Sequence, residues 1–482
     1  MTNVIAHVRS NNEIQTLATH LLEVGELSKQ FATKIHAPEA GELIGLLHDF
    51  GKYSQAFQIY LQSATGLLDP DGDDGDYVDA KAQKGKIDHS TAGAQWVWQN
   101  MKCLGKNGEG KLAGQLLALC IASHHGKGLI DCLKPDGSNE FERRMTKEDE
   151  KTYLQECQKN ADNDDAEILE KARQLINPAI SALWKQYAII KNTKHSETIK
   201  QFYFGFLTRF LFSCLIDADR INSADFETPE NLAHRNQPVL WDDAIKRLEF
   251  FIIEQQNEIE RKRGQFSEKT LRLNEIRRDI SDTCQQRAKD AQGIYTLTVP
   301  TGGGKTYASL RFALHHAKQH NLERIIYIIP YTSIIEQNAE AIRKAIEHEN
   351  DAFPWVLEHH SNLEPEQQTW HSKLVAENWD APIVMTTMVQ FLETLFSGGT
   401  RGVRRLHQLA NSVLIFDEIQ TLPINCTHLF CNALNFLTTY SKTTAVLCTA
   451  TQPLLDNLKS PEKGQLTIPE KNELIGDVNE LF

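Results

Sequence analysis

The 482-residue sequence lacks several features that mark particular classes of protein. Its nine cysteines are odd in number and never form C-x-x-C, so the sequence suggests neither a disulfide framework nor a zinc knuckle and indicates a reducing compartment. The N-terminus has no basic segment followed by an apolar one, and no apolar run is long enough to span a bilayer. We therefore expect a cytoplasmic protein with no membrane partner.

Positive charge is also scarce. The 51 basic and 64 acidic side chains give a net charge of -13, which argues against nucleic-acid binding through an overall basic surface. A local basic groove remains compatible with this charge, and RKR at 261–263 and RGVRR at 401–405 could line one. The acidic stretch 69–86 lacks EF-hand spacing and is expected to be a polar loop. The length predicts about three domains.

The sequence divides into two parts with different periodicity. Before about residue 240, apolar residues recur at helical spacing, as Leu17, Leu21 and Val24 do. After about residue 290, helical patterns alternate with the β-branched runs IYTLTV, RIIYIIP, PIVMTT, SVLIFDE and TAVLCTAT. Such strands are typical of a parallel, doubly wound sheet covered on both faces. We therefore predict a multidomain protein with an all-α domain over residues 1–240, a helical connector over residues 241–290 and an α/β domain with a parallel sheet over residues 291–482.

The α/β part contains a glycine-rich loop between a predicted strand and a predicted helix. The loop residues are Thr301, Gly302, Gly303, Gly304, Lys305 and Thr306. The glycines let successive backbone N–H groups face phosphate oxygens, Lys305 neutralises phosphate charge, and the Thr306 hydroxyl is a ligand for Mg²⁺. Val299 replaces the first glycine of the strict G-x-x-x-x-G-K-[ST] pattern. The form PTGxGKT resembles the variant of helicase-type ATPases.

Two other predicted strands end in polar residues. SVLIFDEIQ carries Asp417 and Glu418, of which one carboxylate holds Mg²⁺ through water and the next orients the attacking water. CTAT carries Thr449, Ala450 and Thr451, whose hydroxyls can couple the phosphate state to a neighbouring domain. Together with the glycine-rich loop, these residues predict a site that binds and hydrolyses ATP with Mg²⁺.

In chain order, PTGGGKT, IIPYTSIIEQNA, DEIQ and TAT resemble motifs I, Ia, II and III of superfamily 2 helicases. Gln420 stands where histidine is frequent, and a glutamine can still donate a hydrogen bond across the domain cleft. LNEIRRDI, with Asn274 and Arg277, resembles the segment that contacts the adenine. The resemblance implies that residues 291–482 form the first of two RecA-like domains. Nothing after Thr451 matches the second. We expect a separate chain or a missing C-terminal part to supply it, and the present chain alone to bind ATP weakly without translocating.

The helical part gathers possible metal ligands at inward-facing or helix-terminal positions. They are His20, His48, Asp49, His89, His124, His125 and Asp217. Asp217 lies in FLFSCLIDAD, where a buried carboxylate requires a metal or a cation. Imidazoles and carboxylates without thiolates suit Mn²⁺, Fe²⁺, Co²⁺ or Ni²⁺.

The order of these residues resembles the HD phosphohydrolase superfamily. HLLEVGELSKQFA, GLLHDFGKYSQAFQ, DHSTAGA, ASHHG and LIDADR are similar to one branch, the CRISPR-associated HD nuclease–helicases of type I systems. The resemblance implies two metal sites bridged by Asp49. The other ligands would be His20, His48 and Asp217 for the first metal, and His89, His124 and His125 for the second. Lys52 would neutralise or protonate the phosphate.

The resemblance implies a metal-dependent single-stranded DNase fused to an ATP-driven helicase core that moves 3′ to 5′. Its substrate would be the strand displaced when a crRNA-guided Cascade complex opens an R-loop. One alternative is an HD phosphohydrolase acting on small nucleotides, with the ATP-binding part as a regulator. Another is a docking subunit with weak catalysis. Only the first hypothesis explains why intact motor motifs follow the helical part.

Overall fold

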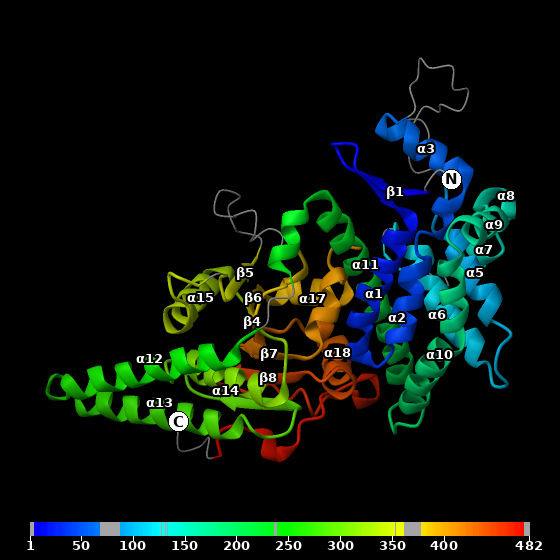
Figure 1. Ribbon diagram of the computed structural model, residues 1–482. Coiled ribbons are helices and arrows are strands. Elements are labelled where there is room, and N and C mark those ends of the chain that lie inside the picture. The colour runs from blue at the N-terminus through cyan, green and yellow to red at the C-terminus, as the bar shows by residue number, and fades with distance from the viewer. Residues whose placement is uncertain are drawn as a thin grey trace. The chain divides into compact units, whose positions relative to one another are not determined.

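The computed structural model divides the chain into two compact units (Figure 1). Unit 1 comprises Met1–Lys194, Phe204–Ala233 and Ser397–His407, and unit 2 comprises His195–Tyr203, His234–Phe396 and Gln408–Phe482. The residues that the structure describes are 4–67, 87–126, 128–130, 132, 134–235, 239–351, 353–360 and 377–476. The predicted acidic loop at 69–86 lies outside the described residues.

Unit 1 is helical, as the sequence predicts, and begins with a short antiparallel hairpin that the sequence pattern did not indicate. The hairpin strands are β1 (Ile5–Val8) and β2 (Ile14–Thr16). The helices are α1 (Leu17–Ala32), α2 (Pro38–Leu47), α3 (Gln55–Thr65), α5 (Thr91–Met101), α6 (Glu109–Ser123), α7 (Glu140–Met145), α8 (Asp149–Thr152), α9 (Leu154–Asp164), α10 (Ala166–Lys191) and α11 (Glu197–Glu227).

Glycines let α1 and α2 pack in close contact (Figure 1). A Cβ atom added to Gly45 would lie 2.6 Å from the Gly25 Cα, and one added to Gly41 would lie 2.4 Å from the Ser28 carbonyl oxygen. Only glycine permits this approach, because any side chain would clash with the opposing backbone. The contact places His20, on α1, beside His48, which follows α2.

Helix α11 is long and apolar enough to be a candidate membrane span by length and composition, which we did not expect from the sequence. In the structure, 67% of its most apolar window is buried, and Phe210, Leu211 and Leu215 are fully enclosed. These properties are those of a helix in a protein core. The helix carries Asp217 and Asp219 at its centre.

Unit 2 contains the predicted parallel sheet, in the strand order β3-β8-β7-β4-β6-β5. The strands are β3 (Ile294–Thr298), β4 (Arg324–Ile329), β5 (Val356–His359), β6 (Ile383–Thr387), β7 (Ser412–Asp417) and β8 (Thr444–Thr449). All but β5 coincide with the predicted runs. The helices between them are α14 (Lys305–His320), α15 (Thr332–Ile346), α17 (Met388–Phe396) and α18 (Thr427–Tyr440).

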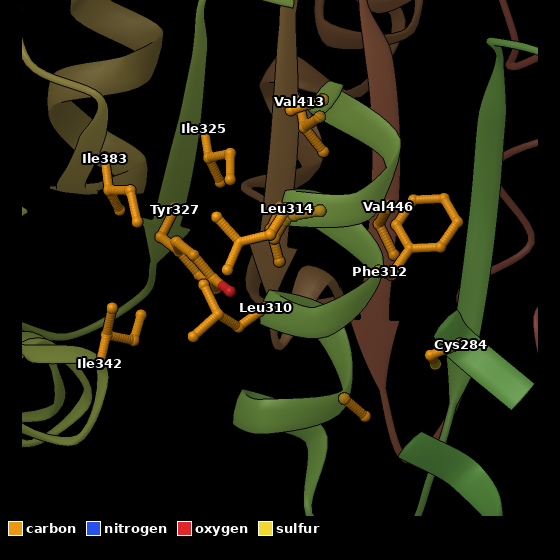
Figure 2. Packing of buried hydrophobic residues seen from close by; sticks show 14 of the residues in the cluster. Cys284, Leu310, Phe312, Leu314, Ile325, Tyr327, Ile342, Ile383, Val413 and Val446 are labelled. Atoms are coloured by element: carbon orange, nitrogen blue, oxygen red, sulfur yellow. The ribbon is translucent and has the colours of Figure 1, made fainter. Parts of the chain in front are cut away.

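Helix α14 covers the middle of the sheet. Figure 2 shows Leu310 and Leu314 of this helix directed towards Ile325, Tyr327 and Val413 on the strands. These side chains are at most 3% exposed. The helix and the strands that carry the nucleotide motifs therefore pack around one apolar core.

The predicted connector is helical but does not stand apart from unit 2. It forms α12 (Trp241–Arg261) and α13 (Glu268–Arg287), both of which contact α14. Trp241, Leu248, Ile280 and Cys284 are buried in the same hydrophobic core as the sheet. The charged outer faces of these helices suggested a linker, whereas their apolar faces make them part of the α/β unit.

We predict that Gly93→Ala destabilises unit 1. Gly93 lies on α5, and a Cβ there would be 1.9 Å from the Leu47 carbonyl oxygen, so the helix must move away from the end of α2. The expected cost is about 1–3 kcal/mol in the free energy of unfolding, measured by urea denaturation of metal-free protein. Gly205→Ala is the matched control, because a Cβ at that helical glycine meets nothing within 4 Å. Equal midpoints for the two variants would contradict the packing described.

Candidate metal centre and nucleotide site

The histidines predicted from the helical part converge on the carboxylate of Asp49. One group consists of His20, His48 and Asp49, and a second consists of Asp49, His89, His124 and His125. Within each group the possible ligand atoms lie within 4.8 Å of one another. Asp49 therefore belongs to both groups, and its role as a bridge between two metals remains a prediction.

The two oxygens of Asp49 face different groups. Its Oδ2 lies 3.5 Å from the Nε2 atoms of both His20 and His48. Its Oδ1 lies 3.0 Å from His124 Nε2 and 3.4 Å from His125 Nε2. His89 Nε2 is farther from this oxygen, at 3.8 Å. A single carboxylate can therefore offer one oxygen to each of two ions.

The ring orientation of several histidines is fixed by a hydrogen bond on the side away from Asp49. His48 Nδ1 donates to the Gly45 carbonyl over 2.8 Å, and His124 Nδ1 donates to the Ile121 carbonyl over 2.7 Å. Both histidines follow the last residue of a helix, so that a carbonyl group of the last helical turn lies within reach of Nδ1. These bonds direct the Nε2 atoms at the cluster, and metal-bound histidines typically make such a bond through the ring nitrogen that does not face the metal.

Electrostatics favour the protonation states that metal binding requires. Burial lowers the pKa of His124 to about 3 and that of His89 to about 4, so both are neutral imidazoles. Burial alone would raise the pKa of Asp49, but the nearby Lys52 ammonium and His48 lower it well below its usual value. The centre therefore presents the neutral imidazoles of His89 and His124 beside an ionised carboxylate.

Two imidazole nitrogens of the first group lie so close together that a cation is expected between them. His20 Nε2 and His48 Nε2 lie 3.2 Å apart, while both Nδ1 atoms face an acceptor. Two lone pairs at this distance repel unless a cation lies between them. A proton on His48 can fill this role, because Asp49 and Asp219 outweigh the effect of burial and raise its pKa. A divalent ion would displace that proton, and the donor set suits it.

Lys52 reaches the centre as predicted. Its ammonium lies 2.7 Å from Asp49 Oδ2 and also donates to the Ala6 carbonyl over 3.4 Å. The side chain is 7% exposed, so its charge is held in place beside the carboxylate. Its contact with a phosphate remains a prediction.

The structure corrects the assignment of Asp217. Its Oδ1 accepts a hydrogen bond from Arg404 Nε over 2.8 Å, and its Oδ2 lies 2.9 Å from His407 Nε2. Burial alone would raise the pKa of Asp217, but these two partners hold it at about 2. The buried carboxylate does have the cationic partner that its environment demands, but this partner is an arginine and not a metal.

The partners of Asp217 come from a distant stretch of sequence. The segment Ser397–His407 lies between α17 and β7 in the chain, yet it belongs to unit 1. Arg404 and Arg405 are each 5% exposed. They are therefore buried structural side chains and do not line the basic groove that we considered for the cluster at 401–405.

Asp219 occupies the place that we predicted for Asp217. Its Oδ1 lies 3.6 Å from the Nε2 atoms of both His20 and His48. Burial would raise the pKa of Asp219, but hydrogen bonding to His48 lowers it. Two residues along a helix correspond to about 200°, so Asp217 and Asp219 point to opposite faces of α11. Both aspartates stand in LIDADR, and the contact of Asn222, one turn after Asp219, with His20 shows which face of α11 belongs to the cluster.

In unit 2 the glycine-rich loop has the backbone shape that phosphate binding needs. Gly302 and Gly304 have φ values of 82° and 86°, and a Cβ on Gly303 would lie 2.4 Å from Val299 Cγ1. Helix α14 begins directly at Lys305. Thr301 is exposed at the start of the loop. Backbone N–H groups at such a helix start form a ready anion site.

A hydrogen-bonded chain links the predicted motifs. Lys305 Nζ is paired with Glu418 Oε1, Gln420 Nε2 donates to Glu418 Oε2 over 2.7 Å, and Thr449 Oγ1 donates to Gln420 Oε1 over 2.5 Å. Burial would raise the pKa of Glu418, but Lys305 and Gln420 lower it. Glu418 also has a φ of 48°, a strained value of the kind found at functional sites. Gln420 thus bonds within its own domain.

The remaining residues of the predicted nucleotide site lie at the end of β8 and on α13. Thr449 Oγ1 also accepts a hydrogen bond from the Thr451 N–H over 3.1 Å, with Ala450 between them at the end of β8. Arg277 Nε donates to the Gly302 carbonyl over 2.9 Å, and its Nη1 lies 3.4 Å from Asn274 Oδ1. The α13 segment therefore lies beside the loop.

One residue that we did not single out joins the Mg²⁺ side of the nucleotide site. Asn338 Oδ1 accepts from Thr306 Oγ1 over 3.4 Å, and a hydrogen bond from Asn338 also acts on Asp417. Burial nevertheless raises the pKa of Asp417 above its usual value. Asn338 comes from the IIEQNA stretch, so this stretch contributes directly to the site.

Comparisons with known proteins identify the two parts separately. Residues 9–208 match the model of the Cas3 HD domain, and residues 278–459 match that of DEAD/DEAH box helicases. Over 182 residues the chain is 32% identical to the CRISPR-associated nuclease/helicase Cas3 of Haloferax volcanii. This alignment covers 34% of the chain and 19% of the relative.

Solved structures share the fold. The crystal structure of T. fusca Cas3 with ADP has a TM-score of 0.51 at 16% identity, covering 94% of this chain and 50% of that one. A crystal structure of a CRISPR-associated protein gives 0.52 at 17% identity, covering 94% and 52%. The chain thus spans about half the length of these structures. The likeness confirms the predicted combination of a helical HD domain and a parallel-sheet α/β domain.

We predict that Arg404→Met changes the stability of the protein, whereas Asp219→Asn changes its affinity for Mn²⁺. Arg404→Met removes a cationic partner from the buried Asp217 carboxylate and should lower the free energy of unfolding by about 3 kcal/mol, leaving Mn²⁺ affinity unchanged. Asp219→Asn should weaken Mn²⁺ binding with little change in the stability of metal-free protein. Denaturation and calorimetric titration measure the two effects. Loss of a metal site in an Asp217→Asn variant that is folded would contradict the correction.

Proposed function

The chain combines a Cas3 HD domain with a DEAD/DEAH box helicase domain, and from this premise we propose that it is a metal-dependent nuclease for single-stranded DNA coupled to an ATP-dependent helicase core. The observation that carries the proposal is the pair of histidine groups that share the Asp49 carboxylate. Two sites bridged by one carboxylate are the arrangement used for phosphodiester hydrolysis by two-metal enzymes.

We assign the first metal to His20, His48, Asp49 and Asp219, and the second to Asp49, His89, His124 and His125. Mn²⁺, Fe²⁺, Co²⁺ or Ni²⁺ suits these ligands. Bound ions would supply an activated water and stabilise the leaving oxygen. The protein fixes the ligand geometry through the hydrogen bonds at Nδ1. Lys52, held beside Asp49, provides positive charge or a proton for the phosphate.

In the helicase part we propose that Lys305 exchanges partners when ATP binds. Its ammonium now pairs with Glu418, and the β- and γ-phosphates would attract it to the glycine-rich loop. Glu418 would then be available to orient the attacking water, while Asp417 and Thr306 hold Mg²⁺. The bonds from Glu418 to Gln420 and from Gln420 to Thr449 give this change a route to the end of β8.

The substrate and partners follow from the family. We propose that the DNA is the strand displaced by a crRNA-guided Cascade complex, in the cytoplasm, and that it is bound mainly through its backbone without sequence preference. Superfamily 2 motors use a second RecA-like domain, so unwinding should require one, from the same polypeptide or another. The CRISPR-associated relative supports this assignment.

We predict that Asp49→Ala abolishes Mn²⁺-dependent cleavage of single-stranded DNA and leaves ATP binding intact. The loss should exceed the ~10–100-fold effect of removing an outer hydrogen-bond partner, because Asp49 serves both sites. A fluorescent oligonucleotide assay measures cleavage. Asp136→Ala, which removes an exposed carboxylate in the same unit, is the control and should cleave normally. Phosphate release from small nucleotides with no cleavage of DNA would contradict the proposal.

The reciprocal prediction concerns Lys305→Ala. This variant should lose ATP binding, measured with a fluorescent ATP analogue, because it lacks the charge that neutralises the phosphates. Its Mn²⁺-dependent cleavage of single strands should persist. Lys318→Ala is the control, since Lys318 lies on the same helix and pairs with Asp242 instead. Unchanged ATP binding by Lys305→Ala would contradict the assignment of the loop.

A further inference from the structure

His20 differs from the other deeply buried histidines of the metal centre in where it lies on its helix. His48 and His124 follow the ends of α2 and α6, and in each the ring is fixed by a hydrogen bond to the carbonyl of the residue three positions earlier. His20 is the fourth residue of α1, where the carbonyl groups already accept hydrogen bonds from backbone N–H groups of the same helix. It therefore needs an acceptor from another part of the chain.

Asn222 of α11 supplies this acceptor. Its Oδ1 lies 2.7 Å from His20 Nδ1, and its side chain is largely buried. The same oxygen accepts a hydrogen bond from Gln15 Nε2 over 3.0 Å. With two donors directed at it, this oxygen is strongly held in front of the imidazole.

Glu23 determines which end of the Asn222 amide faces the histidine. Asn222 Nδ2 donates to Glu23 Oε2 over 2.6 Å, and Gln15 Nε2 also approaches this oxygen at 3.3 Å. A carboxylate accepts and cannot donate, so the amide NH₂ must point to Glu23 and the carbonyl to His20. This requires the proton of neutral His20 to be on Nδ1 and leaves the Nε2 lone pair for the cluster.

We propose that Asn222 is a positioning residue for the metal centre, which sets the tautomer and ring orientation of His20 through a relay that begins at Glu23. The inference rests on the proposed metal centre and adds a residue that does not contact the ion. Because Asp219 lies one turn before Asn222 on α11, a single helical face provides both a ligand and the support for another ligand. The effect is confined to the first metal, since the histidines of the second group lie elsewhere.

The test compares Asn222→Leu with Asn222→Asp in the full chain. Leucine is close to asparagine in size but accepts no hydrogen bond, and we expect Mn²⁺ affinity at one of two sites to fall about 10–100-fold in a calorimetric titration. Aspartate accepts the same bond from His20, and when it is combined with Glu23→Gln, whose amide can donate to it in place of the Glu23 carboxylate 2.6 Å away, it should restore the affinity. His125→Ala, which alters the second group, identifies the unaffected site. Asn160→Leu is the matched control, because that amide bonds to the Tyr53 carbonyl away from the cluster.

A second measurement separates positioning from a loss of stability. In metal-free protein with ¹⁵N-labelled histidine, the His20 signal, assigned with His20→Gln, should report a proton on Nδ1 in the native chain and a mixture of tautomers in Asn222→Leu. Unchanged affinity at both sites in Asn222→Leu would overturn the role of Asn222 while the metal centre stands. A native chain that binds no Mn²⁺ would overturn both.

Discussion

The buried carboxylate of Asp49 is the constraint on which unit 1 depends. A charge that is 2% exposed is costly unless its surroundings compensate for it, and here five imidazoles and one ammonium surround it. The lysine and His48 keep it ionised, while burial lowers the pKa of His89 and His124, so that these two imidazoles are neutral and present lone pairs. The same features that make the carboxylate tolerable in the core suit it to the bridging role that we propose for it.

The packing of the helices serves this cluster. Glycines bring α1 onto α2 and α5 onto the end of α2, and Gly51 lies so close to His89 that a Cβ would be 2.4 Å from its carbonyl oxygen. His48 and His124, which stand just beyond helix ends, have their rings fixed by carbonyl groups of the last helical turn. His20, which lies inside a helix, depends on α11 instead. In unit 2 the ends of elements also position the site, because the ends of strands and the start of a helix bring Lys305, Glu418 and Thr449 together.

Much of this arrangement was predictable from the sequence, for physical reasons. The runs that form β3, β4, β6, β7 and β8 are apolar because both faces of a parallel sheet are covered, and the ligand histidines stand at inward or terminal helix positions. Asp217 was wrongly assigned because its buried environment indicated a cation without revealing that Arg404, 187 residues away, supplies it. Nothing local showed that Ser397–His407 joins the helical unit, or that the short hairpin β1–β2 precedes α1.

The central claim is that two ions share Asp49, and anomalous diffraction from crystals grown with Mn²⁺ tests it most directly. The structure predicts two anomalous peaks in unit 1, one among His20, His48 and Asp219 and one among His89, His124 and His125, each within bonding distance of a different Asp49 oxygen. A single peak that Asp49 does not contact, or peaks at Asp217, would contradict the shared-carboxylate centre.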